Sequence, residues 1–305
     1  MALRVRSGSI VSGEGEAGMQ RSPSAATKPC GRAKTFALAL GAGGARSLAG
    51  IAVVEALDAL GVRPVAISGS SLGALIGAAY AAGITGKEMR RHALAVAHDR
   101  SRTFTRLGAA RTAPLSTWLT APWGNPMLVN AGKFCEAFLP PGLPADFSDL
   151  QIPLTIVATD LYARSEFVFT AGPLQPALSA SMAIPGLVEP VELAGRILVD
   201  GAALNPLPFD HLRGCADIIV AIDCSGAAMP AAGIPDPWDC LFMTLQVMSQ
   251  TIVASKLAAG APDLVIRPNV GSFRLLDFFH ASAILRAADP IKAQIEKQLG
   301  ALLND

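Results

Sequence analysis

Short apolar runs alternate with longer helical patterns from about residue 35 onward. Phe36–Leu40 is the first continuous apolar run, and it stops at Gly41, as a buried strand does where it enters a turn. Similar runs predict strands at 36–40, 65–68, 154–158, 166–169, 197–199 and 218–222. Helical patterns predict helices at 47–60, 72–82, 177–182 and 237–259. Because strands alternate with helices, the chain is predicted to have an α/β fold with a largely parallel sheet.

Two segments depart from this alternation. Residues 1–34 combine Arg and Lys with Gly, Ser and Pro and lack the apolar core of a secretory signal, so we expect a flexible basic tail before one domain at 35–305. Residues 100–150 are rich in proline, which interrupts regular structure, and predict a lid-like insertion. Its apolar side chains are expected either to face lipid or to form an ordinary packing layer; they include Trp118, Trp123, Met127 and Leu128.

Composition and charge exclude several classes of protein. Hydrophobic residues make up 51% of the chain and charged residues 16%, which is enough apolar material for a sheet covered on both faces. The formal net charge is +1 and no basic stripe alternates with aromatic residues, so we expect no binding of nucleic acid. Arg46, Glu55 and Asp58 interrupt the longest apolar stretch, which therefore falls short of the ~18 residues of a spanning helix. We expect a soluble, cytoplasmic protein, with peripheral membrane contact and homo-oligomer formation left open.

The cysteines point neither to a disulfide framework nor to a metal site. Their number is odd and they form no CxxC pair; they are Cys30, Cys135, Cys215, Cys224 and Cys240. We therefore expect a reducing compartment, with these residues acting as small apolar side chains.

The segment 69–73 matches the pattern G-x-S-x-G of a nucleophile elbow, with Ser71 at its centre. It falls between a predicted strand and a predicted helix, which is where this pattern lies when its serine is a nucleophile. Gly69 and Gly73 fit because a Cβ at either position, before or after Ser71, is expected to collide with the adjoining strand or helix. The sequence predicts a nucleophilic Ser71, and the alternative is a serine that caps the helix.

A glycine-rich turn at 41–46 follows the first predicted strand and opens the first predicted helix. Its free N–H groups lie at the positive end of a helix dipole and are suited to bind negative charge. A dinucleotide-binding fold needs an acidic residue at the end of the second strand, where this chain has Ser68-Gly69-Ser70. We therefore favour an oxyanion hole over a phosphate site, formed by Gly43, Gly44, Ala45 and Arg46.

A nucleophilic serine needs a base, and the residue pattern leaves several candidates. The four histidines show no triad placement, and only His280 is late enough for the chain order Ser, acid, His. A carboxylate is the alternative, because burial raises its pKa toward a working value. Asp160, Asp200 and Asp223 each follow a predicted strand, so position alone does not choose among them.

Together these motifs resemble the patatin-like phospholipase family, in particular its short bacterial members. The family's oxyanion loop G-G-G-x-R-G is similar to residues 42–47, its G-x-S-x-G to 69–73, and its D-G-[GA] motif to 200–202. The similarity also covers 158–161, 181–186 and 205–208, and spans roughly 35 to 290. Ala42 and Ser47 depart from the family, which often has glycine at these positions.

The resemblance implies a patatin-like three-layer α/β/α fold with a mainly parallel central sheet. It also implies Ser71 as nucleophile and Asp200 as proton acceptor of a Ser–Asp dyad, which leaves Asp160 and Asp223 as structural carboxylates. The implied activity is hydrolysis of lipid carboxylic esters, of phospholipid or lysophospholipid type, through an acyl-enzyme and without a metal or organic cofactor. The alternatives are a catalytically silent regulatory or lipid-binding protein of this fold and, more distantly, a nucleotide-binding α/β domain.

Overall fold

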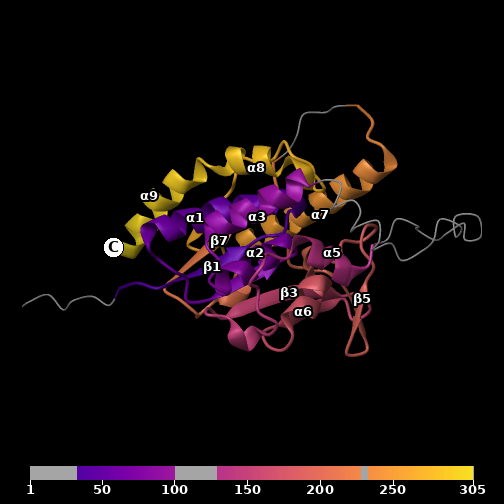
Figure 1. Cartoon of the computed structure of the whole chain (residues 1–305), viewed down its shortest axis with the longest axis horizontal. Coiled ribbons are helices and arrows are strands. Elements are labelled where there is room, and N and C mark those ends of the chain that lie inside the picture. Colours follow the sequence, from indigo (N-terminus) through magenta and orange to yellow (C-terminus); the bar gives the residue numbers. More distant parts are fainter. Residues whose placement is uncertain (1–32, 100–128, 228–232, 305) are drawn as a thin grey trace, which may run out of the picture. The chain divides into compact units, whose positions relative to one another are not determined.

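The computed structural model describes residues 33–99, 129–227 and 233–304 of the chain (Figure 1). These residues belong to the unit that extends from Ala33 to Asp305. Most of the predicted basic tail lies outside the described residues, as does the first part of the predicted lid, including Trp118, Trp123, Met127 and Leu128.

The described strands form one mixed sheet. They are β1 (Phe36–Leu40), β2 (Ile67–Ser70), β3 (Leu154–Asp160), β4 (Ser165–Phe169), β5 (Val191–Leu193), β6 (Arg196–Asp200), β7 (Ile218–Ile222) and β8 (Leu264–Ile266). Their order is β5-β6-β3-β2-β1-β7-β8, with β4 paired to β3. The central pairs and the pair β7–β8 are parallel, whereas β4, β5 and β6 pair antiparallel. The predicted α/β class and largely parallel sheet are confirmed.

Helices and short 3-10 turns connect these strands. The helices are α1 (Ala49–Leu60), α2 (Leu72–Ala81), α3 (Gly86–His98), α5 (Ala131–Phe138), α6 (Leu174–Ser181), α7 (Pro237–Ala259), α8 (Ala281–Ala288) and α9 (Ile291–Asn304). The 3-10 turns are η1 (Gly44–Leu48), η3 (Phe147–Asp149), η4 (Gly201–Ala203), η5 (Phe209–Leu212) and η6 (Phe278–His280). Within the described ranges, no helix is both long enough and apolar enough to cross a membrane.

Some elements differ from their prediction for physical reasons. The strand predicted at 65–68 is instead β2 at Ile67–Ser70, because Ser68, Gly69 and Ser70 continue the pairing with β3. The helix predicted at 47–60 begins as the 3-10 turn η1. The pattern of apolar residues did not predict α3, because α3 is a surface helix that buries only Gly86, Met89 and Ala97.

Strand β1 shows why both faces of the sheet are covered. Alternate side chains of a strand point to opposite faces. Phe36, Leu38 and Leu40 pack in the larger core with the apolar sides of α1, α2, α8 and α9, and Figure 1 shows α1, α3, α8 and α9 grouped together. Ala37 and Ala39 face a second cluster that includes Phe209 of η5 and Val253 of α7. Helices therefore lie on both faces, as predicted for the three-layer fold.

The antiparallel strand β6 is the element that positions the site. On one edge of β3, β4 pairs with Ile156 to Asp160. Two strands pair with the opposite edge of β3. Strand β2 pairs with its first part, up to Val157, and β6 pairs with its last part, from Ala158 to Asp160. The strands β2 and β6 thus run toward each other along β3. Their carboxyl ends meet, and the residues that follow them are brought into contact.

Candidate active site

Ser71 lies on a strained turn between β2 and α2. Its φ of 55° is in the left-handed region, which a residue with a side chain rarely adopts and which costs on the order of 1–3 kcal/mol. The flanking glycines leave the turn room, since a Cβ at Gly69 would lie 2.5 Å from Ala74 Cα and one at Gly73 would lie 2.4 Å from Leu40 O. The Ser71 N–H donates to Ser181 Oγ at 2.9 Å. The Ser71 side chain is therefore held at the end of the strand by the backbone around it.

Asp200 ends β6 and accepts a hydrogen bond from Ser71 Oγ through Oδ2, at 2.6 Å. Its other oxygen, Oδ1, accepts from the Ala202 N–H at 2.8 Å. Burial raises the pKa of Asp200 to about 6, and the hydrogen bonds from Ser71 and Ala202 oppose that rise without cancelling it. A carboxylate of this kind is a stronger base than an exposed aspartate, and it lies in direct contact with a hydroxyl group.

The other predicted base candidates are engaged elsewhere. Asp160 is paired with Arg196 at 2.6 Å, and hydrogen bonds from the Ala163 N–H and from Arg196 hold its pKa below the usual range. Asp223 accepts from Ser225 Oγ at 2.6 Å and from Arg267 Nε at 3.0 Å. The side chain of His280 is 59% exposed and lies 3.4 Å from Asp277. Among the described residues, the recorded partner of Ser71 Oγ is Asp200.

In the glycine-rich loop beside Ser71, some backbone N–H groups are hydrogen-bonded within the protein and others are not. The Ala45 N–H donates to Leu275 O at 2.8 Å, and the Arg46 N–H donates to Gly43 O at 3.2 Å. In the described part of the chain, no partner is recorded for the N–H of Gly43 or Gly44. Gly44 has a φ of +55°, and a Cβ there would lie 2.2 Å from Leu275 O. Of the predicted oxyanion residues, Gly43 and Gly44 are thus the two whose N–H groups are unengaged.

Arg46 and Ser47 hold this loop from inside the protein. Arg46 is 1% exposed, and its Nε donates to Gly43 O at 3.2 Å. Its Nη1 has no hydrogen-bond partner within the described residues, and burial lowers the pKa of the guanidinium. Ser47 Oγ donates to Gly41 O at 3.1 Å. Ser47 does not line the cavity described below, whereas Ala42 does.

A cavity of about 590 Å³ opens onto these groups. Ser71, Asp200, Gly43, Gly44 and Arg46 all line it. Its remaining walls are mainly apolar and come to a large extent from α7; they include Ile184, Leu245, Val247, Met248, Ile252 and Leu275. The volume is within the usual range of small-molecule sites, roughly 300–1,000 Å³, and the lining suits a substrate with an apolar chain.

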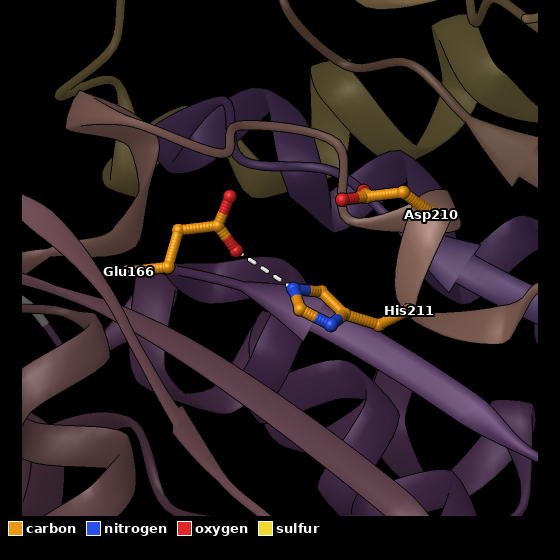
Figure 2. Close-up of side chains that lie close together, drawn as sticks. All are labelled: Glu166, Asp210 and His211. Carbon is orange, nitrogen blue, oxygen red and sulfur yellow. Dashed lines mark hydrogen bonds and ion pairs between the residues drawn. The ribbon is translucent and has the colours of Figure 1, made fainter.

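A second polar group lies between β4, η5 and α7. Figure 2 shows Glu166 and His211 pointing toward each other with Asp210 nearby, and one ligand atom of each lies within 4.8 Å of the others. His211 Nε2 is 2.7 Å from Glu166 Oε2, and Lys256 Nζ donates to Asp210 Oδ1 at 2.5 Å. Asn205 Nδ2 also donates to Glu166, at 3.1 Å. Asp210 is therefore paired with the Lys256 cation, and Glu166 with His211, a contact that is ionic when His211 is protonated; we call these four residues the ion-pair network.

Sequence reasoning missed two contributors to the site. Ser181 bridges the elbow to the sheet, since its Oγ accepts from the Ser71 N–H and donates to Val157 O at 2.7 Å. Its only signal was its place in the family-like segment 181–186. Helix α7 was predicted, but its role as a wall of the cavity depends on tertiary packing and had no signal along the chain.

The fold and the site define an α/β protein with a serine on a strand–helix elbow, a buried carboxylate at hydrogen-bond distance and an adjacent loop with unengaged N–H groups. A family model described as patatin-like phospholipase matches residues 38–213. The chain belongs to the patatin-like phospholipase family, which confirms the resemblance found in the sequence.

Two proteins of similar sequence agree with this family. An uncharacterised NTE-family protein of Mycobacterium bovis is 38% identical over 202 residues, which are 66% of this chain and 52% of that protein. Lysophospholipase nte1 of Aspergillus fumigatus is 30% identical over 201 residues, covering 65% of this chain and 12% of that protein. The chain thus spans about half the length of the first relative and a smaller part of the second. The structure of VipD from Legionella pneumophila aligns with a TM-score of 0.45 and 13% identity, over 86% of this chain and 66% of that one.

Proposed function

We propose that this chain is a serine acyl hydrolase that cleaves carboxylic esters of lipids, of the phospholipid or lysophospholipid type. The observation that carries the proposal is the 2.6 Å hydrogen bond from Ser71 Oγ to a buried Asp200 in an apolar cavity. Family membership and the name of the fungal relative, a lysophospholipase, support lipid esters as the substrate class.

The proposed reaction begins with proton transfer from Ser71 Oγ to Asp200, while Oγ attacks the ester carbonyl carbon. Negative charge then develops on the carbonyl oxygen, and the N–H groups of Gly43 and Gly44 stabilise it. As the carbon–oxygen bond to the alcohol breaks, Asp200 returns its proton to the leaving alcohol and an acyl-enzyme remains on Ser71. Asp200 next takes a proton from water, whose oxygen attacks the acyl carbon, and the carboxylic acid leaves as Ser71 regains its proton.

Arg46 supports this scheme as a positioning residue. Its buried guanidinium is bonded to Gly43 O and therefore holds the loop whose N–H groups are assigned to the oxyanion. The positive charge also lies on the wall of the same cavity, where it favours an anionic intermediate over a neutral ground state. Both effects of Arg46, holding the loop in place and favouring negative charge, stabilise the oxyanion.

Labelling with a fluorophosphonate and hydrolysis of a short p-nitrophenyl ester test this proposal. Wild type is expected to label at Ser71 and to turn over, and Ser71→Ala to do neither. Ser70→Ala is the matched control, because Ser70 is the adjacent buried serine and its hydroxyl has no partner in the described part of the protein. A wild type that neither labels nor turns over would favour a catalytically silent lipid-binding or regulatory protein.

A further inference from the structure

Apolar side chains are exposed along the first half of α7 and just before it. Ten large hydrophobic side chains are exposed among the described residues, and six of them lie between 234 and 248. These six are Ile234, Trp238, Leu241, Met243, Val247 and Met248. Figure 1 shows the start of α7 extending away from the helices grouped on the sheet. Such a concentration of exposed apolar groups indicates a surface that binds a protein or a lipid layer when the protein acts.

This part of α7 also lacks the charged face of an ordinary surface helix. Between Asp239 and Lys256 the chain contains no Asp, Glu, Lys, Arg or His. Asp239 itself is paired with Arg274 at 2.8 Å. A surface helix normally exposes charged side chains to water. Because this part of α7 exposes apolar side chains and no charged ones, its contact with water is unfavourable.

The exposed surface is continuous with the wall of the catalytic cavity. Val247 and Met248 are 60% and 57% exposed, and both also line the cavity that contains Ser71. An apolar path therefore leads from the outside of α7 to the nucleophile. A protein docked on this helix would cover the route to the cavity, whereas a lipid layer docked there would supply molecules that fit it.

We propose that α7 and Ile234 dock on the surface of a lipid layer, so that Ser71 receives its ester from that layer rather than from water. The proposal rests on the proposed function. Because the docking face carries no cationic groups, apolar burial provides the affinity. Binding is accordingly expected on vesicles of zwitterionic phosphatidylcholine, with little loss at high salt.

Co-sedimentation with phosphatidylcholine vesicles tests the docking face, using the full chain as Ser71→Ala so that the lipid is not consumed. Adding Ile234→Glu and Met243→Glu, neither of which lines the cavity, is expected to weaken vesicle binding roughly tenfold or more. The matched control is Leu161→Glu with Tyr162→Glu, since both side chains are exposed and lie between β3 and β4. Equal binding by the α7 variant and the parent, or no binding by the parent, overturns the proposal.

Two exposed cysteines provide a site-specific readout. Cys240 lies on α7 and Cys215 lies between η5 and β7, and both are exposed. In Cys30→Ser variants that keep one exposed cysteine and have the other replaced by serine, an environment-sensitive dye on Cys240 is expected to shift to the blue on vesicles, while the same dye on Cys215 is not. Equal shifts, or no shift at Cys240, overturn the docking orientation.

Hydrolysis of a short, water-soluble p-nitrophenyl ester separates this proposal from the proposed function. The variant Ile234→Glu with Met243→Glu, made on an intact Ser71, is expected to hydrolyse that ester at the wild-type rate. Absent vesicle binding with normal ester hydrolysis overturns the docking alone, whereas absent labelling and hydrolysis in wild type overturn the proposed function. A lipid-free dimer that the α7 substitutions dissociate makes this face an interface between copies and also overturns the docking.

Discussion

The carboxylate of Asp200 differs from those of Glu166 and Asp210 in the groups that surround it. Among the described residues no cation is bonded to Asp200, whereas Asp210 is paired with Lys256 and Glu166 with His211. Asp200 is bonded to a hydroxyl and an N–H, and burial raises its pKa to about 6. Glu166 is bonded to His211, which lowers its pKa. Burial acts to raise the pKa of Asp210, but the hydrogen bonds from Lys256 and Asn205 outweigh it and the pKa is lowered.

Neighbouring cations explain why some carboxylates of one fold lose their basicity while another keeps it. A carboxylate paired with a cation is stabilised in its charged form and gives up its basicity. A buried carboxylate without a cation destabilises the folded protein when charged, but it can accept a proton near neutral pH. We therefore expect substitutions at Asp200 and in the ion-pair network to have opposite effects on activity and stability.

Asp200→Asn should give the largest effect on activity, a loss of about 10⁴-fold in kcat, because the serine loses its base. The same change should stabilise the protein at pH 8. The folded pKa of Asp200, about 6, is above the ordinary aspartate value of 3.8, so ionisation opposes folding as pH rises through that interval. The difference corresponds to at most about 3 kcal/mol. Ester hydrolysis and chemical denaturation at pH 8 measure both effects.

Asp160→Asn is the control for this substitution. Asp160 also ends a strand, but it is paired with Arg196 and its pKa is lowered, so its removal should cost stability and leave hydrolysis largely intact. Retained hydrolysis in Asp200→Asn together with its loss in Asp160→Asn would reverse the assignment of the base.

Gly44→Ala should reduce kcat by about 10²–10³-fold, the usual cost of a lost oxyanion donor. The Cβ would lie 2.2 Å from Leu275 O and would displace the loop. Gly61→Ala is the matched control, because Gly61 has a similar positive φ of +66° but nothing within 4 Å of its Cβ position. Steady-state kinetics of the two variants separate loop displacement from backbone strain, and equal kcat losses would count against an oxyanion role.

The pH dependence of wild-type kcat/KM should report the raised pKa of Asp200. The base must be deprotonated, so activity should fall about tenfold per pH unit below pH 6 and level off above it. The profile is measured with an uncharged ester, with protein stability checked at each pH. An activity that stays level down to pH 4.5 would contradict a base with this pKa.

Glu166→Gln should have the smallest effect, a loss of about 1 kcal/mol in the free energy of unfolding with ester hydrolysis unchanged. Glu166 has a lowered pKa, so its contribution to stability is lost as pH falls below 4.5, the ordinary pKa of a glutamate. His211 has a raised pKa, so its contribution is complete below 6.5 and is lost as pH rises through its folded pKa. The pair should therefore stabilise most between these values.

A double-mutant cycle with His211→Gln measures this coupling. The coupling energy between Glu166 and His211 should be larger at pH 6 than at pH 9. A coupling that does not change with pH would indicate a neutral hydrogen bond in place of the ion pair.

Much of the fold and several parts of the site were predictable because they depend on local sequence. The bounds of α7 agree with the predicted 237–259, since Asp236 caps its first turn through hydrogen bonds from Trp238 and Asp239 and Gly260 follows its last residue. The turn at Ser71 was predictable because Gly69 and Gly73 lie two positions before and after it in the chain, and the absence of a side chain at both leaves the turn the space it needs.

The structure decided which groups meet and what each meeting does to their charge. Residue pattern alone left Asp160, Asp200 and Asp223 equivalent at strand ends, and the family resemblance singled out Asp200. The contact between Ser71 and Asp200 spans 129 positions and depends on β6 running antiparallel beside the end of β2. Likewise, Leu275 engages the Ala45 N–H from a distant segment. Local sequence determines backbone conformation, whereas burial and hydrogen-bond partners come from residues far apart in the chain, and these set the pKa of Asp200 and the free N–H groups of the loop.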